Sequence, residues 1–245
     1  MKKIIILFCL ISFGLLFNTC DKENQFDCFK TTGKETSVTR NLDTFDKILV
    51  FDKLEVILIE GPLHSVRLEG GENVLSLVKT EVKGGQLEIS NHNTCNVVRS
   101  YKRKIKVYVT APKYSEITHR GVGEINSFDT LHADHLIYRV LNSGNLRLTV
   151  DNAQMSGVLN GMGDFNCSGK SDHHTVNANG ECHVNCGNLT TKNSDYLLKI
   201  SGPSYVNVSS ELKVIIRNTG NVYYTGNPSQ ITKDITGTGK LISGF

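Results

Sequence analysis

The sequence predicts an all-β protein, a right-handed parallel β-helix of about seven coils with an N-terminal β-rich capping region. A short glycine-containing pattern recurs seven times between residues 119 and 241, and every copy ends on an apolar residue. The composition agrees, since 22 Gly, no Trp and 7% aromatic residues accompany an absence of helix-period apolar stripes. At 245 residues the chain is long enough to bury a sizeable core.

The spacing of the repeat indicates which repeat architecture it builds. The copies are His119–Ile125, Val140–Leu146, Leu159–Phe165, Ala178–Val184, Ile200–Val206, Ile216–Val222 and Ile235–Leu241. They recur about every 19 residues, which is too short for a propeller blade and lacks the leucine-rich-repeat consensus. One circuit of a β-helix fits this period, with about 3.3 Å per residue along the strand and about 4.8 Å between coils.

Aligned columns of the repeat predict which residues turn and which face inward. The third position is Gly or Asn in every copy, which predicts a left-handed turn residue, and the fifth is mostly Gly, which predicts a crowded backbone site. The seventh position predicts an inward column: Ile125, Leu146, Phe165, Val184, Val206, Val222 and Leu241. Each repeat is therefore expected to read strand, Gly turn, strand, loop, over residues 118–245.

The sixth position of the repeat is polar or amphipathic in every copy, so its side chains are expected to form a row on the outer surface. Polysaccharide lyases and hydrolases with a β-helix fold need clustered carboxylates or a basic residue on such a surface. The members of this sixth column are Glu124, Asn145, Asp164, His183, Tyr205, Asn221 and Lys240. No two acidic residues occupy adjacent coils. The sequence therefore predicts no catalytic residue, and a polysaccharide-active enzyme is the weaker alternative.

The N-terminus reads as an export signal. Lys2 and Lys3 precede the apolar run Ile4–Phe17, and Cys20 follows it directly. This order predicts a lipoprotein signal peptide over residues 1–19, with Cys20 lipidated and residues 20–37 forming a polar tether. Asn18 and Thr19 stand where smaller residues are usual, so a plain secretory signal or an uncleaved anchor remain alternatives. The signal contains two of the 27 Lys and Arg residues and none of the 24 acidic residues, so the chain without it has a net charge of +1. This charge gives no reason to expect a nucleic-acid partner.

Five cysteines remain beyond the signal and the anchor, which is an odd number. They are Cys28, Cys95, Cys167, Cys182 and Cys186. A bridge between Cys28 and Cys95 is one possibility in an exported protein. The alignment places Cys167 and Cys186 one period apart in the same inward column, which favours stacked buried thiols over a disulfide.

Residues 38–117 carry no Gly turn repeat but alternate strongly between apolar and polar residues, which predicts strands. A short helical turn is expected at Asn73–Lys79. These strands could cap one end of the β-helix and cover its backbone edge. The expected strands are Phe45–Phe51, Leu54–Ile59, Ser65–Leu68, Gln86–Ile89 and Ile105–Val109.

The chain resembles the "putative autotransporter adhesin", or head GIN domain, family of envelope proteins over about residues 38–243. The resemblance rests on the Gly-x-Gly turns and on the segments Phe45–Ile48, Val56–Gly61, Gln86–Ile89, Ile105–Pro112 and Gly220–Pro228. The full Gly-x-Gly stands in only three of the seven copies. The resemblance implies a β-helix and an adhesive or head-region role in the envelope, and it implies no particular ligand.

Two histidine pairs and one basic segment are candidate sites. His132 with His135, and His173 with His174, resemble metal ligands, but neither spacing repeats and both are expected in loops between strands, which favours solvated histidines over a metal site. Arg99–Lys106 is basic and could bind an acidic polysaccharide or lipid headgroups, or could simply lead into a strand.

Together these patterns predict a non-catalytic lipoprotein of the bacterial outer membrane, on the periplasmic face or the cell surface. Its expected partners are the membrane, through the lipid anchor, and a glycan or an envelope protein bound by the β-helix. An alternative is a structural element whose coil end stacks on a second copy. No ligand-binding residue, metal or cofactor is specified by the sequence.

Overall fold

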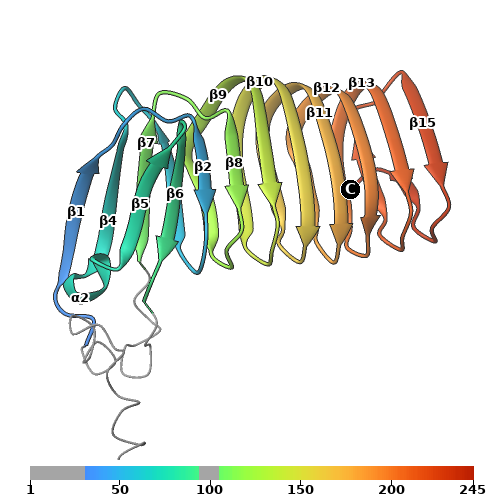
Figure 1. Ribbon diagram of the computed structural model, residues 1–245. Coiled ribbons are helices and arrows are strands. Elements are labelled where there is room, and N and C mark those ends of the chain that lie inside the picture. Colours follow the sequence, from blue (N-terminus) through green and yellow to red (C-terminus); the bar gives the residue numbers. More distant parts are fainter. Residues whose placement is uncertain (1–30, 94–104) are drawn as a thin grey trace, which may run out of the picture.

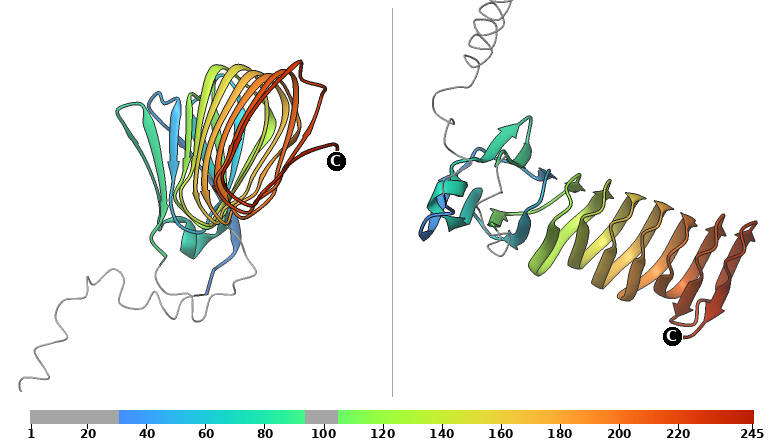
Figure 2. Two further views of the ribbon diagram at one scale, coloured as in Figure 1. Left: turned by 90° about the vertical axis from the view of Figure 1, so that its right-hand side faces the viewer. Right: turned by 90° about the horizontal axis from the view of Figure 1, so that it is seen from below.

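The computed structural model describes residues 31–93 and 105–245, which form a β-solenoid of about seven turns (Figure 1). The prediction of an all-β parallel solenoid is confirmed. Cys20, Cys28, Cys95 and most of the basic segment Arg99–Lys106 lie outside the described residues. Figure 2 shows the successive coils nested around a common interior and stacked in order along one axis.

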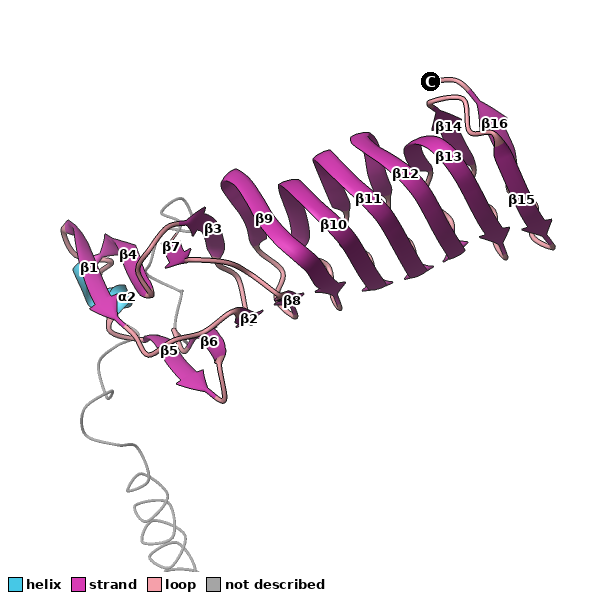
Figure 3. Cartoon of the chain, turned by 90° about the horizontal axis from the view of Figure 1, so that it is seen from above, coloured by secondary structure: helices cyan, strands magenta, loops and turns pink. Residues whose placement is uncertain are grey.

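Five long strands build the regular part of the solenoid and pair in parallel, in chain order (Figure 3). They are β9 (Glu124–Val140), β10 (Asn145–Gly161), β11 (Phe165–Gly180), β12 (Val184–Ile200) and β13 (Ser204–Ile216). Each runs through almost a whole coil. The loop expected between two strands of each repeat is therefore wrong for these coils.

The strands turn the corner of the solenoid without breaking. In β10, Ala153 and Gln154 are both exposed, so the alternation of inward and outward residues shifts phase there and resumes with buried Met155. Parallel pairing continues on both sides of this corner. Because backbone hydrogen bonding to both neighbouring coils is kept, the strand bends where the sequence pattern suggested a loop.

The last coil is divided into shorter strands. They are β14 (Val222–Thr225), β15 (Gln230–Ile235) and β16 (Leu241–Ser243), of which β14 and β15 pair with β13 and β16 pairs with β14. The break lies at Gly226 and Asn227, which both have positive φ.

The N-terminal half contributes to the solenoid itself. Its elements are β1 (Glu35–Asn41), β2 (Lys47–Val50), β3 (Glu55–Glu60), β4 (Ser65–Gly71), α2 (Glu72–Leu75), β5 (Val78–Lys83), β6 (Gln86–Asn91), β7 (Lys106–Ala111) and β8 (Glu116–His119). All five strands expected from the sequence are present. β2, β3, β7 and β8 join parallel ladders that lead into β9, whereas β1 and β4 add antiparallel strands beyond β7 and β5 pairs antiparallel with β6.

The residues of the predicted inward column lie in the core, but the predicted place of Val206 is wrong. Ser204 pairs with both Val184 and Val222, whereas Val206 pairs with Cys186. Ile125, Leu146, Phe165, Val184, Val206 and Val222 are completely buried, and Leu241 in the last coil is partly exposed. Cys167, Cys182 and Cys186 are buried free thiols. Cys167 and Cys186 directly follow the paired residues Asn166 and Asn185 on neighbouring coils, and both thiols are buried without a disulfide, as expected.

The Gly turns are explained by crowding more than by φ. Within the described residues, only Gly161 and Gly180 of the third column have positive φ, so the left-handed turn expected at the other five positions is wrong. A Cβ at Gly121 would lie 2.0 Å from the carbonyl oxygen of Asp52, and a Cβ at Gly163 would lie 2.1 Å from that of Gly144. The turns of successive coils stack too closely for a side chain, as expected for the fifth column.

The sixth column has a structural role that links successive turns. Asp164 N–H donates to Asn145 Oδ1 (3.0 Å), and His183 N–H donates to Asp164 Oδ1 (2.9 Å). Lys240 N–H donates to Asn221 Oδ1 (2.9 Å) in the last coil. These side chains satisfy backbone donors at the turns, where the strand ladder is interrupted.

Candidate functional site

A polar groove crosses the first stretch of β9 to β12 and encloses about 370 Å³. Its lining is Asn126, Ser127, Arg147, Leu148, Thr149, Asn166, Cys167, Ser168, Asn185 and Asn188. Leu148 and Cys167 are buried, whereas the amide, hydroxyl and guanidinium groups around them are partly or fully exposed. The groove is therefore a hydrogen-bonding surface over a narrow apolar base.

Aligned β-bulges accompany the groove. The register shifts between Arg147 and Thr149 where β10 meets β9, and between Asn166 and Ser168 where β11 meets β12. Bulges bend a strand and re-aim its side chains. Gly169 lies one residue beyond the second shift with φ +103°, and a Cβ there would lie 2.0 Å from the Val150 carbonyl oxygen. The β-bulges therefore lie beside the polar lining of the groove, next to a point where the backbones of Gly169 and Val150 come close together.

One row of side chains runs along the groove, with one residue from each of four consecutive coils. Asn126 pairs with Arg147, Arg147 with Asn166, and Asn166 with Asn185. Asn185 Nδ2 donates to Asn166 Oδ1 (3.3 Å). We call these four residues the amide row. Each lies about 4.8 Å from the next, the spacing between neighbouring strands.

A second row of hydroxyl groups lies beside the amide row. Thr149 N–H donates to Ser127 Oγ (2.8 Å), and Thr149 Oγ1 lies 3.0 Å from Ser168 Oγ. These contacts join three coils. They hold the hydroxyl side of the groove in a fixed arrangement, which lowers the entropy cost of binding a ligand there.

The groove contains little net charge. Arg147 is the one charged residue in its lining, and its Nη1 lies 3.3 Å from Glu124 Oε1 at the groove's margin. Both side chains are partly exposed, so the pair contributes little to stability. It neutralises the groove, which favours an uncharged ligand.

An aliphatic residue bounds the amide row at one end and an aromatic residue at the other. Ile57 pairs with Asn126 across β3 and β9, and Tyr205 pairs with Asn185 across β12 and β13. The Tyr205 ring stacks on Tyr223, with centroids 5.2 Å apart, and meets Phe245 edge to face. The row of hydrogen-bonding groups is thus limited to four coils.

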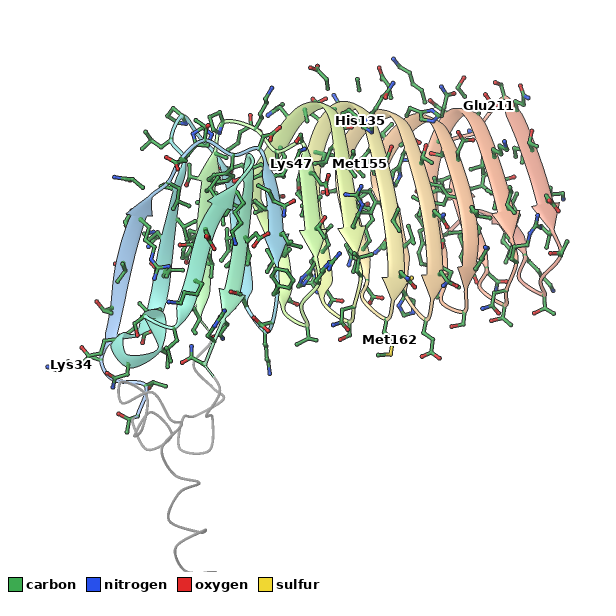
Figure 4. All side chains as sticks on the ribbon, viewed as in Figure 1. Lys34, Lys47, His135, Met155, Met162 and Glu211 are labelled. Atoms are coloured by element: carbon green, nitrogen blue, oxygen red, sulfur yellow. The ribbon has the colours of Figure 1, made fainter. Side chains whose placement is uncertain are left out.

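Three of the four histidines weighed from the sequence lie at the outer corner of the solenoid, within strands and not in loops. His132 and His135 are exposed, and His173 is partly exposed. Figure 4 places His135 at the upper edge, opposite Met162 on the Gly-turn edge. His132 Nδ1 lies 3.3 Å from Glu60 Oε2, and His173 Nε2 lies 3.2 Å from Asp195 Oδ2.

The expectation of a solvated histidine is wrong for His174, which is completely buried. Tyr138 Oη lies 2.9 Å from its Nε2, and Tyr196 Oη lies 2.9 Å from its Nδ1. Burial, together with a smaller effect of the neighbouring His173, lowers the pKa of His174 to about 3. His174 pairs with Met155, an inward residue, and this one-period spacing was the signal that could have revealed its orientation.

An acidic hollow of about 480 Å³ lies at the same corner, lined in part by Asp134, Asp151, Asp172, His132 and Lys113. Across residues 31–93 and 105–245, no group of three or more His, Cys, Asp or Glu is placed to hold a metal ion. In the same ranges, no helix has the length and apolarity to cross a membrane.

The structure defines a parallel β-solenoid repeat protein with a polar groove on one wall. The chain belongs to the family described as "Putative auto-transporter adhesin, head GIN domain", whose model matches residues 44–228. Adhesins act at the cell surface, so membership associates the chain with the cell envelope or surface. No match is found among curated proteins.

Solved structures share the fold at low sequence identity. A "putative adhesin" from Bacteroides fragilis has a TM-score of 0.82 and 20% identity, covering 88% of this chain and 100% of its own. A "putative lipid binding protein" from Parabacteroides distasonis has a TM-score of 0.67 and 18% identity, with the same coverage. A "putative adhesin" from Parabacteroides merdae has a TM-score of 0.65 and 16% identity, covering 87% and 97%. These likenesses establish the fold.

Proposed function

We propose that this protein is a lipid-anchored envelope protein that binds a glycan in its polar groove. The observation that carries the proposal is the amide row, which offers hydrogen-bonding side chains on four consecutive coils. An Asn side chain both donates and accepts, as a sugar hydroxyl does. Membership of an adhesin family supports a binding role at the cell surface.

The proposed anchor is a lipid on Cys20. The apolar run Ile4–Phe17 followed at once by a polar stretch beginning at Cys20 supports cleavage before this cysteine. Several acyl chains would hold the protein to a membrane, because each buried methylene contributes about 0.8 kcal/mol. We place the protein at the bacterial outer membrane, facing the periplasm or the outside.

The lining of the groove favours binding of a glycan without its hydrolysis. Glycoside hydrolysis ordinarily requires two carboxyl groups flanking the scissile bond. The lining residues include no Asp or Glu, and Glu124 at the margin is paired with Arg147. The groove therefore offers contacts that retain a sugar chain, and a polysaccharide-active enzyme is the less favoured function.

End-to-end self-assembly is also less favoured. In the last coil, Lys233 pairs with Val214, which in turn pairs with Tyr196. Val214 and Tyr196 are buried and face inward. A further coil stacked on β15 would bury the Lys233 ammonium group. An inward-facing charge on an edge strand is a recognised way to prevent such pairing.

The test is retention of the chain on an array of immobilised bacterial and host glycans. We expect the parent chain to be retained on at least one glycan, and the double variant Asn166→Ala/Asn185→Ala to lose most of that retention. The matched control is Asn177→Ala, an exposed asparagine in the second half of β11 and outside the groove. Equal retention of both variants, or no retention of the parent on any glycan, would contradict the proposal.

A further inference from the structure

We propose that the ligand is a neutral, linear glycan lying along the solenoid axis, with one sugar unit per coil and four units bound. This inference rests on the proposed function and specifies the ligand of the same groove. It follows from the period of the amide row, its charge and its two ends.

The period of the amide row selects the kind of polymer. Neighbouring coils are about 4.8 Å apart. A pyranose unit in an extended, equatorially linked chain advances by nearly the same distance. Successive units are turned over, but each presents hydroxyl groups at both edges of its ring, so each can hydrogen-bond the side chain of one coil. An extended peptide advances about 3.3 Å per residue and repeats a face only every second residue, so it would fall out of step with the coils.

The available hydrogen-bonding groups match a neutral sugar. Within the described part of the chain, the side-chain amides of Asn126 and Asn188 have no hydrogen-bond partner in the protein, so they are available to a ligand. Asn166 and Asn185 are joined through one donor and one acceptor, which leaves the second group of each amide for a ligand. The single cation, Arg147, is paired with Glu124 and does not call for a carboxylate or sulfate on the sugar.

The ends of the row set the number of units. Ile57 precedes Asn126, and Tyr205 follows Asn185, so the side-chain amides are replaced by an aliphatic side chain beyond one end and an aromatic ring beyond the other. Tyr205 is also engaged with Tyr223 and Phe245 on the far side. A fifth unit would therefore gain little.

Isothermal titration calorimetry with oligosaccharides of increasing length tests this inference. The probes are β-1,4-linked oligomers of glucose, mannose and N-acetylglucosamine, from two to six units, with oligogalacturonate and an extended peptide for comparison. In at least one neutral series we expect Kd to fall about threefold to tenfold with each unit up to four, the gain from one net hydrogen bond, and then to stay constant. Asn126→Ala should remove the last step, so that the plateau begins at three units, and Asn177→Ala should leave it at four.

The outcomes separate the inference from the proposed function. An affinity that does not depend on length, a plateau at another length in the parent chain, or tighter binding of the oligogalacturonate or peptide would overturn the inference. If the array still retains the parent chain through Asn166 and Asn185, the proposed function would stand without it. If the array and every oligosaccharide fail to bind, both would be overturned.

Discussion

The phenol oxygen of Tyr138 lies 2.9 Å from Nε2 of His174 in the sealed interior of the solenoid, two coils away along the chain. The phenol oxygen of Tyr196 lies 2.9 Å from Nδ1, the other ring nitrogen of His174. A neutral imidazole has one donor and one acceptor, so one phenol donates and the other accepts. Protonation would make both ring nitrogens donors, so the phenol that donates to the neutral ring would lose its acceptor.

This arrangement predicts a loss of stability in mild acid. The pKa of His174 is about 3 in the folded protein and about 6.5 in the unfolded chain, because burial disfavours the charged ring. Between these values the unfolded state binds more protons, so the free energy of unfolding falls as pH falls from about 6.5 toward 3. The slope from this residue reaches about 1.4 kcal/mol per pH unit. Burial also lowers the pKa of His119, which adds a contribution of the same sign.

Denaturant unfolding between pH 4 and pH 8 measures this dependence. His174→Phe should be less stable at pH 7 by about 1–3 kcal/mol for each phenol left without its partner. Its stability should nevertheless depend less on pH than that of the parent chain. Parallel pH profiles for the two proteins would show that His174 does not carry the effect.

The Gly turns predict a steric penalty at the fifth column. In Gly163→Ala the new Cβ would lie 2.1 Å from the Gly144 carbonyl oxygen, a backbone atom that cannot move aside alone. We expect a loss of about 1–3 kcal/mol, as for overpacking of a core. Met162→Ala in the same turn is the control, because Met162 is 62% exposed. Equal unfolding midpoints for the two variants would mean that the stacked turns are not tightly packed.

The open end of the last coil predicts a gain of association on removal of one charge. Lys233→Val would extend the inward column that contains Tyr196 and Val214 with an apolar residue. We expect concentration-dependent dimers or larger species in sedimentation velocity, whereas the parent chain should show less association. Lys199→Val, at an exposed position within β12, controls for the loss of a positive charge. If Lys233→Val sediments as the parent does, Lys233 does not protect this end.

The proposed anchor predicts a change of cell fraction. Cys20→Ser would leave no thiol for acylation after the signal, so the protein should move from the membrane fraction to a soluble or uncleaved form. Fractionation of expressing cells, with mass spectrometry of the N-terminal peptide, measures this. A parent chain whose N-terminal peptide carries no lipid on Cys20 would contradict the proposal and argue for a plain secretory signal or an uncleaved anchor.

The regular coils could be predicted because they depend on residues that repeat along the chain. The inward column from Ile125 to Val184 and the crowded glycines follow from spacing alone. Beyond Val184 the column continues through Ser204, where the spacing had placed Val206. The order of the N-terminal strands does not, since β3 lies beside β9 although β4 to β8 intervene in the sequence. Such pairing depends on contacts between distant segments, which local alternation does not encode.

The groove was missed for a related reason. It accompanies register shifts beside Arg147 and Asn166, and an alignment on the Gly turns does not show where one strand gains a residue over its neighbour. A signal was nevertheless present directly after the apolar column, where Asn126, Asn166 and Asn185 recur in the same position. His174 was assigned to solvent because the corner was interpreted as a loop, although its strand continues through it.

The most direct test of the central claim, that the polar groove is the binding surface, is a nuclear magnetic resonance titration of the side-chain amides. The glycan that the array identifies would be added to the 15N-labelled protein. The account predicts shifts of the Asn126, Asn166, Asn185 and Asn188 amide signals, with the signal of Asn177 unchanged. Shifts confined to Asn177 or to the outer corner near His135, with the four groove amides unmoved, would contradict it.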